Sequence, residues 1–229
     1  MAYFGRVLAV GLTKNDEPAV VYGISGRSEG SKKRKLVIED YERNPCVHVR
    51  EVGELTADQK ARYNIFFYPA IVAYDSERAA VVTNGDHTKD VCNFDLSFEE
   101  ALRGRNHEPD DYSTPRIAAE IENNNREHTG EGYLIKAALL ASEAHTFMRV
   151  EEMKPGICVC VSTYQGIGDE PEKPEKGGIW HQKFGGTTAQ DLADELYNWL
   201  DSDKRVAAGA AVMNDNSREW QLAVRNLHE

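Results

Sequence analysis

Short apolar runs rich in β-branched residues recur along this chain and are separated by polar turn residues. Residues 4–11 and 18–24 are two such runs, and Lys14-Asn15-Asp16-Glu17 between them suits a turn. Residues 69–74 and 78–83 form a second pair around a short polar link. Apolar runs of this length, joined by short polar links, predict antiparallel β-hairpins.

Further strand candidates follow the same pattern. They are residues 35–38, 47–49, 117–121, 133–139, 146–150, 157–163, 207–213 and 219–224. The start of the third of these is ambiguous, because Pro115 after Thr114 also suits the first turn of a helix. The alternation of Ile117, Ala119 and Ile121 favours a strand.

Signals for helices are fewer. Ser97-Phe98-Glu99-Glu100 has the pattern of a capping box and predicts a short helix toward Leu102, and residues 57–62 are rich in helix formers. Thr188 suits the N-cap of a longer helix with a stripe of core residues at Leu192, Leu196, Trp199 and Leu200. Many hairpin strands and few helices predict an α+β fold, in which two packed antiparallel sheets are flanked by helices.

Composition limits the partners and the number of domains. At 229 residues and 41% hydrophobic content, we expect one domain spanning residues 1–229. The formal charge of −11 opposes binding to a phosphate backbone, so nucleic acid is not an expected partner. No apolar run approaches the ~20 residues of a membrane-spanning helix, and no signal peptide is apparent. We therefore expect a cytoplasmic protein without a membrane partner.

One basic cluster stands out in this acidic chain. Lys32-Lys33-Arg34-Lys35 follows a Gly/Ser-rich segment. It is either a solvated loop or an anchor for a phosphate group.

The spacing of the cysteines and the absence of a metalloprotease motif argue against a metal site. None of Cys46, Cys92, Cys158 and Cys160 forms a Cys-x-x-Cys pair, and the last two alternate with valines as on one face of a strand. We expect free thiols, no structural zinc and no cofactor. The metalloprotease motif His-Glu-x-x-His is not present.

Several motifs together carry a resemblance to a known family. Tyr112-Ser113-Thr114-Pro115-Arg116-Ile117-Ala118-Ala119-Glu120-Ile121 and Asn84-Gly85-Asp86-His87-Thr88 resemble hallmarks of the archaeal-type IMP cyclohydrolases. The resemblance continues at Phe4-Gly5-Arg6-Val7-Leu8-Ala9-Val10-Gly11, Ile24-Ser25-Gly26-Arg27-Ser28, Pro69-Ala70-Ile71-Val72-Ala73-Tyr74 and Met213-Asn214-Asp215. The motifs occur in the family's order over most of the chain.

The resemblance implies a fold and a reaction. The fold is the four-layer αββα arrangement of the N-terminal-nucleophile hydrolases, and the assembly is a homodimer or homotetramer. The reaction closes 5-formamido-imidazole-4-carboxamide ribonucleotide to IMP with loss of water, in purine biosynthesis. Met1 is followed by Ala2, so we do not expect the N-terminal nucleophile common in that fold. Ring closure within one molecule needs orientation, oxyanion stabilisation and proton transfer, with no metal or covalent nucleophile.

The resemblance also implies catalytic residues. Tyr74 matches the family's active-site tyrosine and is expected to donate to the formyl oxygen, although a tyrosine at a strand end is otherwise a core residue. Glu108 matches a glutamate expected to orient or deprotonate the carboxamide, although its acidic surroundings also suit a solvated loop. Arg34 matches the family's second arginine, but the loop before it differs in length, so Lys32 or Lys33 can take its place.

The expected substrate-binding residues are Arg27, Lys33, Asn84, His87 and Arg116. Guanidinium groups suit bidentate contacts with phosphate. Three of these residues have a structural alternative as well: Asn84-Gly85 suits a turn, His87 a buried structural role and Arg116 an internal ion pair.

Two other functions remain open at this point. An amidohydrolase of the same fold would use Ser25, Ser28 or a thiol as its nucleophile. A protein that binds purine ribonucleotides without catalysis would keep the pocket alone.

Overall fold

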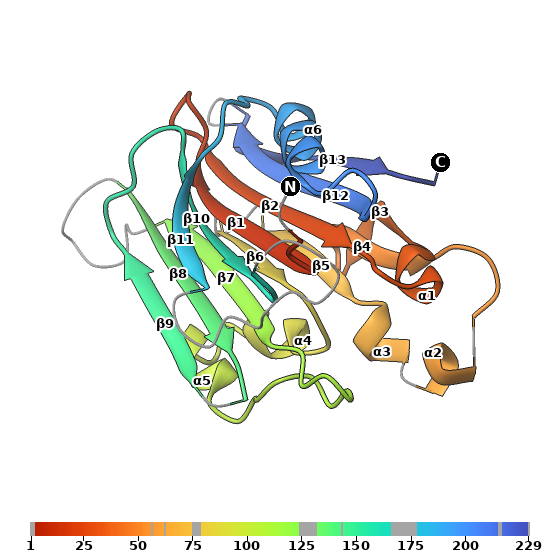
Figure 1. Cartoon of the computed structure of the whole chain (residues 1–229). Coiled ribbons are helices and arrows are strands. Elements are labelled where there is room, and N and C mark those ends of the chain that lie inside the picture. Colours follow the sequence, from red (N-terminus) through yellow and green to blue (C-terminus); the bar gives the residue numbers. More distant parts are fainter. Residues whose placement is uncertain are drawn as a thin grey trace.

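The computed structural model describes residues 3–55, 57–61, 63–74, 79–123, 132–142, 144–165, 178–214 and 217–228. Over these ranges the chain forms two antiparallel sheets with a few helices packed against them (Figure 1). This is the α+β arrangement of two packed sheets that the sequence predicts.

The strands divide between a first sheet, here sheet A, and a second, here sheet B. Sheet A has the order β11-β10-β1-β2-β12-β13, with β1 (Arg6–Leu12), β2 (Pro18–Ser25), β10 (Ile157–Ser162), β11 (Ile179–Lys183), β12 (Arg205–Asn214) and β13 (Glu219–Asn226). Sheet B runs in sequence order through β3 (Arg34–Tyr41), β4 (Asn44–Glu51), β5 (Pro69–Tyr74), β6 (Ala79–Thr83), β7 (Arg116–Asn123), β8 (Tyr133–Leu140) and β9 (His145–Val150).

Both predicted hairpins are confirmed. Arg6 to Leu12 of β1 pair with Ile24 to Pro18 of β2, and the Thr13 hydroxyl in the turn accepts backbone N–H bonds from Asn15 (3.2 Å) and Glu17 (3.2 Å). In the second hairpin, β5 and β6 pair from Ile71–Val82 to Tyr74–Ala79. Asn84-Gly85 at its end does not close a hairpin; it leads into a helix.

The main core lies between the sheets. Alternate residues of strands from both sheets meet there, among them Leu8, Val20, Leu36, Ile71, Val82, Ile117 and Ile135. The other faces of many strands are covered as well, so every residue of β2 is buried. Burial on both faces explains why these strands are continuous apolar runs in the sequence.

One helix covers the outer face of sheet A (Figure 1). In α6 (Ala189–Trp199) the Thr188 hydroxyl accepts the N–H of Asp191 (3.1 Å), and the Asp191 carboxylate accepts the N–H of Thr188 (3.2 Å). This is the predicted N-cap, completed as a capping box. Leu192, Leu196 and Leu200 are buried as predicted, whereas Trp199 is only partly buried.

Shorter helices pack on the outer face of sheet B. α4 (Thr88–Val91) and α5 (Phe98–Leu102) bring Val91, Phe98 and Leu102 against the sheet, and Ser97 forms the predicted capping box with Glu100. The remaining helices, α1 (Glu29–Lys32), α2 (Ala57–Ala61) and α3 (Tyr63–Phe66), lie in links between strands. Both outer faces therefore carry helices, in unequal amounts.

Four elements differ from the sequence prediction, and two of them are the unpredicted four-residue helices α3 and α4. β11 was not predicted, because Ile179–Lys183 is an edge strand whose Trp180, His181 and Gln182 carry no apolar run. α1 replaces part of the predicted loop, where Ser28 and Ser31 form a capping box. The loop predicted at residues 169–178 lies, except for its last residue, outside the described residues, as does Asp215.

No helix among the described residues combines the length and apolar character needed to cross a bilayer.

Candidate active site

Most of the predicted site residues come from one end of the sandwich. β1, β3, β5 and β7 begin at this end, and β2 and β6 finish there. Arg34 is at the start of β3, Asn84 follows β6, and Arg116 is at the start of β7. The long link between α5 and β7 returns to the same end and carries Glu108.

Asn84 joins the Glu108 link to the start of β7. Its Nδ2 donates to Glu108 Oε1 (3.2 Å) and to the Pro115 carbonyl (3.1 Å), and its Oδ1 accepts the N–H of Ile117 (2.8 Å). The Glu108 N–H donates to the Thr114 carbonyl (2.7 Å). The buried Asn84 amide thus fixes the orientation of the Glu108 carboxyl, a role beyond a simple turn.

Glu108 is a buried acid, so the alternative of a solvated acidic loop is wrong. Its exposed fraction is 5%. Burial raises the pKa of Glu108 to about 8, while the cations Arg6 and Arg116 act in the opposite direction. A carboxyl group with this pKa is mostly protonated at neutral pH and can donate a proton.

Arg116 lies beside this carboxyl in an ion-pair network. Its Nη1 donates to Asp86 Oδ1 (2.7 Å), and Arg105 bridges from Asp86 (3.4 Å) to Asp90 (2.6 Å, from Nε). The internal ion pair considered from the sequence is therefore present. Arg116 Nε is buried without a hydrogen-bond partner among the described residues, so the guanidinium keeps a free donor.

His87 is buried and neutral, and its Nδ1 has no hydrogen-bond partner among the described residues. It is fully buried, and its Nε2 lies 3.1 Å from the Ile117 carbonyl, which can only accept, so Nε2 carries the proton. Burial, reinforced by Arg116, lowers the pKa of His87 to about 3. A proton shuttle near neutral pH, as considered from the sequence, is not supported by this environment.

A cluster of Arg6, Tyr22 and Tyr68 adds residues that the sequence analysis missed. Arg6 Nε donates to the Tyr68 hydroxyl (3.4 Å), which lies 2.6 Å from the Tyr22 hydroxyl. Burial would lower the pKa of Arg6, but Tyr68, Tyr22 and Glu108 raise it overall, so the cation and the Glu108 carboxyl influence each other. A sequence signal existed: Arg6 shares the alternation of Leu8 and Val10, which face the core.

Arg34 is the inward-pointing residue of the basic cluster. It is buried, its Cζ lies 4.9 Å from the Phe66 ring centre, and its Nε and Nη1 have no hydrogen-bond partner among the described residues. Lys33 is exposed at the end of α1. The geometry therefore favours Arg34 over Lys33 as a ligand for a buried anion.

Arg27 lies at the rim of the same end. Its Cζ is 5.2 Å from the Tyr3 ring centre and 5.6 Å from that of Tyr164. The Tyr164 hydroxyl lies 3.1 Å from Thr114 Oγ1, on the link that holds Glu108. Arg27 is exposed, so it can reach only the outer part of a ligand bound here.

Tyr74 does not join this group. It pairs with Ala79 at the far end of β5, roughly 17 Å along the strand from Pro69 at ~3.3 Å per residue. Its ring packs on the outer face of sheet B, edge-on to Phe94 at 4.6 Å, and burial raises its pKa. The structure thus separates Tyr74 from Glu108 and gives it the core role that the sequence left as the alternative.

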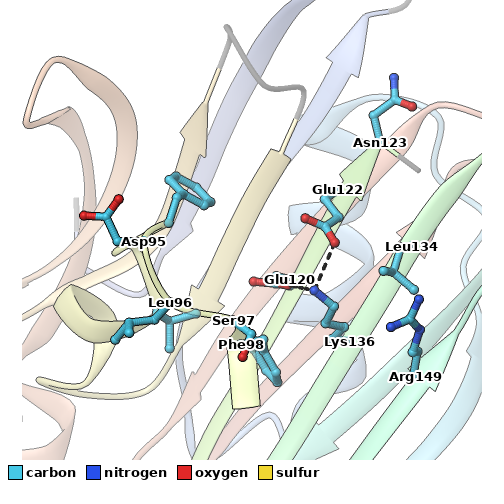
Figure 2. Close-up of a pocket in the computed structure, with 12 residues that line it drawn as sticks. Asp95, Leu96, Ser97, Phe98, Glu120, Glu122, Asn123, Leu134, Lys136 and Arg149 are labelled. Atoms are coloured by element: carbon cyan, nitrogen blue, oxygen red, sulfur yellow. Dashed lines mark hydrogen bonds and ion pairs between the residues drawn. The ribbon is translucent and has the colours of Figure 1, made fainter. Parts of the chain in front are cut away.

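A separate hollow of about 320 Å³ lies on this outer face of sheet B. Figure 2 shows Lys136 between Glu120 and Glu122, facing the segment from Asp95 to Phe98. The Lys136 ammonium lies 2.7 Å from Glu120 and 2.9 Å from Glu122. None of the predicted site residues lines this hollow.

The nucleophiles considered for an amidohydrolase are poorly placed. Ser25 is fully buried, and the Ser28 hydroxyl caps α1. Burial raises the pKa of Cys92 and Cys158 to about 12, and it also raises the pKa of Cys46 and Cys160. Thiols with such pKa values carry almost no thiolate at neutral pH. Cys158 and Cys160 lie on the α6-facing side of β10, as predicted.

The fold and the site together define a class: a two-sheet α+β protein with buried acid, phenol and guanidinium groups at one end of the sandwich, suited to proton transfer on a small anion. The family model described as IMP cyclohydrolase-like protein matches residues 3–217. The chain belongs to this family.

Similar proteins cover nearly the whole chain. The IMP cyclohydrolase of Methanocaldococcus jannaschii is 28% identical over 220 residues, which span 93% of this chain and 94% of that protein. That of Methanococcus aeolicus is 29% identical over 203 residues, 80% of this chain and 90% of that protein. That of Thermococcus kodakarensis is 27% identical, with coverages of 97% and 98%.

Proposed function

We propose that this protein is an IMP cyclohydrolase, which closes 5-formamido-imidazole-4-carboxamide ribonucleotide to IMP with loss of water in purine biosynthesis. The observation that carries the proposal is the buried, oriented Glu108 carboxyl beside Arg6 and Tyr68, in a chain that is similar to IMP cyclohydrolases over most of its length.

Ring closure makes two chemical demands. The carboxamide nitrogen attacks the formyl carbon, a C–N bond forms, and negative charge develops on the formyl oxygen. The oxyanion takes up one proton to become a hydroxyl, and the hydroxyl takes up a second proton and leaves as water. The attacking nitrogen and the former formamide nitrogen each lose one proton, which restores the group that donated to the leaving hydroxyl. Both steps are served by donors held near the formyl oxygen.

Glu108 and Tyr68 supply these donors. Glu108 is largely protonated at neutral pH and can deliver a proton to the leaving hydroxyl. Each phenol has a single hydrogen, so when Tyr22 donates to Tyr68, the Tyr68 hydrogen is free for the formyl oxygen. Arg6 donates to the same Tyr68 oxygen, which strengthens that phenol as a donor.

The arginines bind the ribonucleotide. Arg34 and Arg116 have buried N–H groups without partners, which a phosphate or carbonyl oxygen of the substrate would satisfy. Arg27 contacts the outer part of the ligand, and Asn84 and His87 hold the walls of the site. Lys33 assists through its charge alone.

The wider predictions belong to the same proposal. One domain spans residues 1–229 and adopts the four-layer αββα arrangement of the N-terminal-nucleophile type, for which helices on both outer faces give support. The protein works in the cytoplasm, as a homo-oligomer.

Purified protein incubated with the formylated ribonucleotide will form IMP faster than the uncatalysed reaction. Tyr68→Phe will slow single-turnover ring closure roughly a hundredfold, as expected for loss of one oriented donor. Tyr74→Phe is the matched control and will keep the wild-type rate, since that phenol lies on the opposite face. No IMP above the uncatalysed rate would contradict the proposed function, and a slow Tyr74→Phe would contradict the assignment of the donor.

A further inference from the structure

A second hollow, of about 530 Å³, lies beside α6 on the outer face of sheet A. Its walls come from α6, β12 and β13: Gln190, Asp194, Tyr197, Arg205, Val224, Arg225 and Asn226. Figure 1 places α6 over β12 and β13, on the side of sheet A away from sheet B. The Glu108 cluster faces the space between the sheets, so the two sites are separated by sheet A. The volume lies within the ~300–1,000 Å³ of small-molecule sites.

Two arginines in this hollow share one aromatic ring. The Cζ of Arg205 lies 4.6 Å and that of Arg225 5.1 Å from the Tyr197 ring centre. Tyr197 is buried in the cluster under α6, so its position is fixed. Stacking on a ring restrains a guanidinium while its N–H edge stays available for hydrogen bonds. The pair is therefore held in place before any ligand arrives.

The charges in the hollow do not cancel. Arg225 Nη1 lies 2.8 Å from Asp194 Oδ1, and Gln190 Nε2 donates to the other oxygen of Asp194 (3.2 Å). Arg205 has neither an ion-pair nor a side-chain hydrogen-bond partner within the described part of the chain. Two guanidiniums and one carboxylate leave one net positive charge, in a protein whose formal charge is −11.

The remaining wall is rigid. The Asn226 side chain accepts the N–H of Leu36 (2.7 Å) and donates to its carbonyl (3.0 Å), which ties β13 to the edge strand β3 of sheet B. Its amide is thus already satisfied and holds the rim in place. The charged donors in this lining are those of the two arginines.

We propose that this hollow is a second anion-binding site, in which Arg205 and Arg225 together bind a phosphate group. Planar guanidiniums match the oxygens of a phosphate through paired N–H bonds. The ligand is inorganic phosphate or the phosphate of a nucleoside monophosphate, and the proposal does not depend on the reaction at Glu108.

The test follows the Nε–Hε NMR signals of Arg205 and Arg225 during a titration with inorganic phosphate at constant ionic strength. Each signal is assigned by its absence in Arg205→Gln or Arg225→Gln. We expect saturable shifts at both arginines in the wild type, and a dissociation constant increased about tenfold or more in each variant, as for loss of a charge-assisted bond. Exposed Arg103, the residue after α5, provides the control, and Arg103→Gln will leave the dissociation constant unchanged.

A parallel titration with a nucleoside 5′-monophosphate shows whether the site binds inorganic phosphate or a nucleotide. Saturation at concentrations at least tenfold lower identifies a nucleotide site, and equal constants identify a phosphate site. Shifts that grow linearly, equal to those of Arg103, would overturn the proposal. If Arg205→Gln unfolds, Arg205→Lys keeps the charge without the planar fork, and wild-type affinity in that variant would also overturn it.

Discussion

At the scale of single residues, the burial of Glu108 raises its pKa, on which the proposed chemistry depends. A carboxyl on a solvated loop would be ionised at neutral pH and could only accept a proton. The Asn84 amide and the surrounding protein instead keep Glu108 oriented and largely protonated. The sequence could name Glu108 through its resemblance to the family, but its acidic neighbours gave no local sign of burial.

The first prediction concerns Glu108→Gln. The pKa of Glu108 is raised to about 8, so the wild-type rate of ring closure should fall as pH rises through that value. The glutamine variant should be slower by roughly a hundredfold and lose this pH dependence. Single-turnover rates between pH 6 and pH 10 measure both effects. A wild-type rate that stays flat or rises across pH 8 would exclude Glu108 as the acid.

The same substitution has a consequence for stability. The folded-state pKa of Glu108 lies above its unfolded value, so its stabilising contribution is complete below the unfolded value near 4.5 and is lost as pH rises through about 8. Glu108→Gln removes this loss. Relative to the wild type, the variant should gain on the order of a few kcal/mol of unfolding free energy at pH 9 and little at pH 4.5. Urea denaturation at both pH values tests this.

At the scale of elements, the sequence predicted those features that depend on residues close together in the chain. The hairpins, the capping boxes at Ser97 and Thr188 and the core stripe of α6 all depend on residues a few positions apart. β11 was not predicted, because this edge strand is stabilised by its pairing with β10 and not by apolar residues of its own. The position of the Tyr74 side chain on the outer face of sheet B was not predicted either, since its direction depends on strand register and sheet packing.

A substitution at Leu196 tests how much the packing of α6 on sheet A contributes to stability. Leu196 is fully buried, and Gly23 of β2 leaves space for it, since a Cβ there would lie 3.0 Å from Leu196 Cδ2. Leu196→Ala should cost about 2 to 5 kcal/mol of unfolding free energy. The exposed Gln190→Ala on the same helix should cost less than about 0.5 kcal/mol by comparison. Equal losses in the two variants, measured by chemical denaturation, would mean that α6 is not held by this contact.

At the scale of the whole molecule, the site is assembled from residues far apart in the chain. Arg6 and Tyr68 are 62 positions apart, and Asn84 and Glu108 are 24 apart. These contacts exist only because the two sheets pack with the starts of β1, β5 and β7 at one end. No spacing in the sequence encodes that geometry, so Tyr22 and Tyr68 could be found only from the packed fold, and the alternation in β1 indicates only that Arg6 faces inward.

Arg34 links the stability of the molecule to its function. A buried guanidinium with two unpartnered nitrogens destabilises the folded state, because its lost hydration is not replaced. Arg34→Met keeps the volume and the packing on Phe66 but removes the charge. It should raise the unfolding free energy by on the order of 1 to 4 kcal/mol and weaken ribonucleotide binding tenfold or more.

Measurements of stability and of binding together show whether Arg34 is a ligand-binding residue or a structural one. Denaturation with urea and binding of IMP by calorimetry are compared between Arg34→Met and the exposed control Arg103→Met, which should change neither. If Arg34→Met instead lowers stability, Arg34 is needed by the fold itself and its buried donors are not reserved for a substrate. If stability rises while binding falls, the cation is kept at a cost to the fold, as expected for a site that an anionic ligand completes.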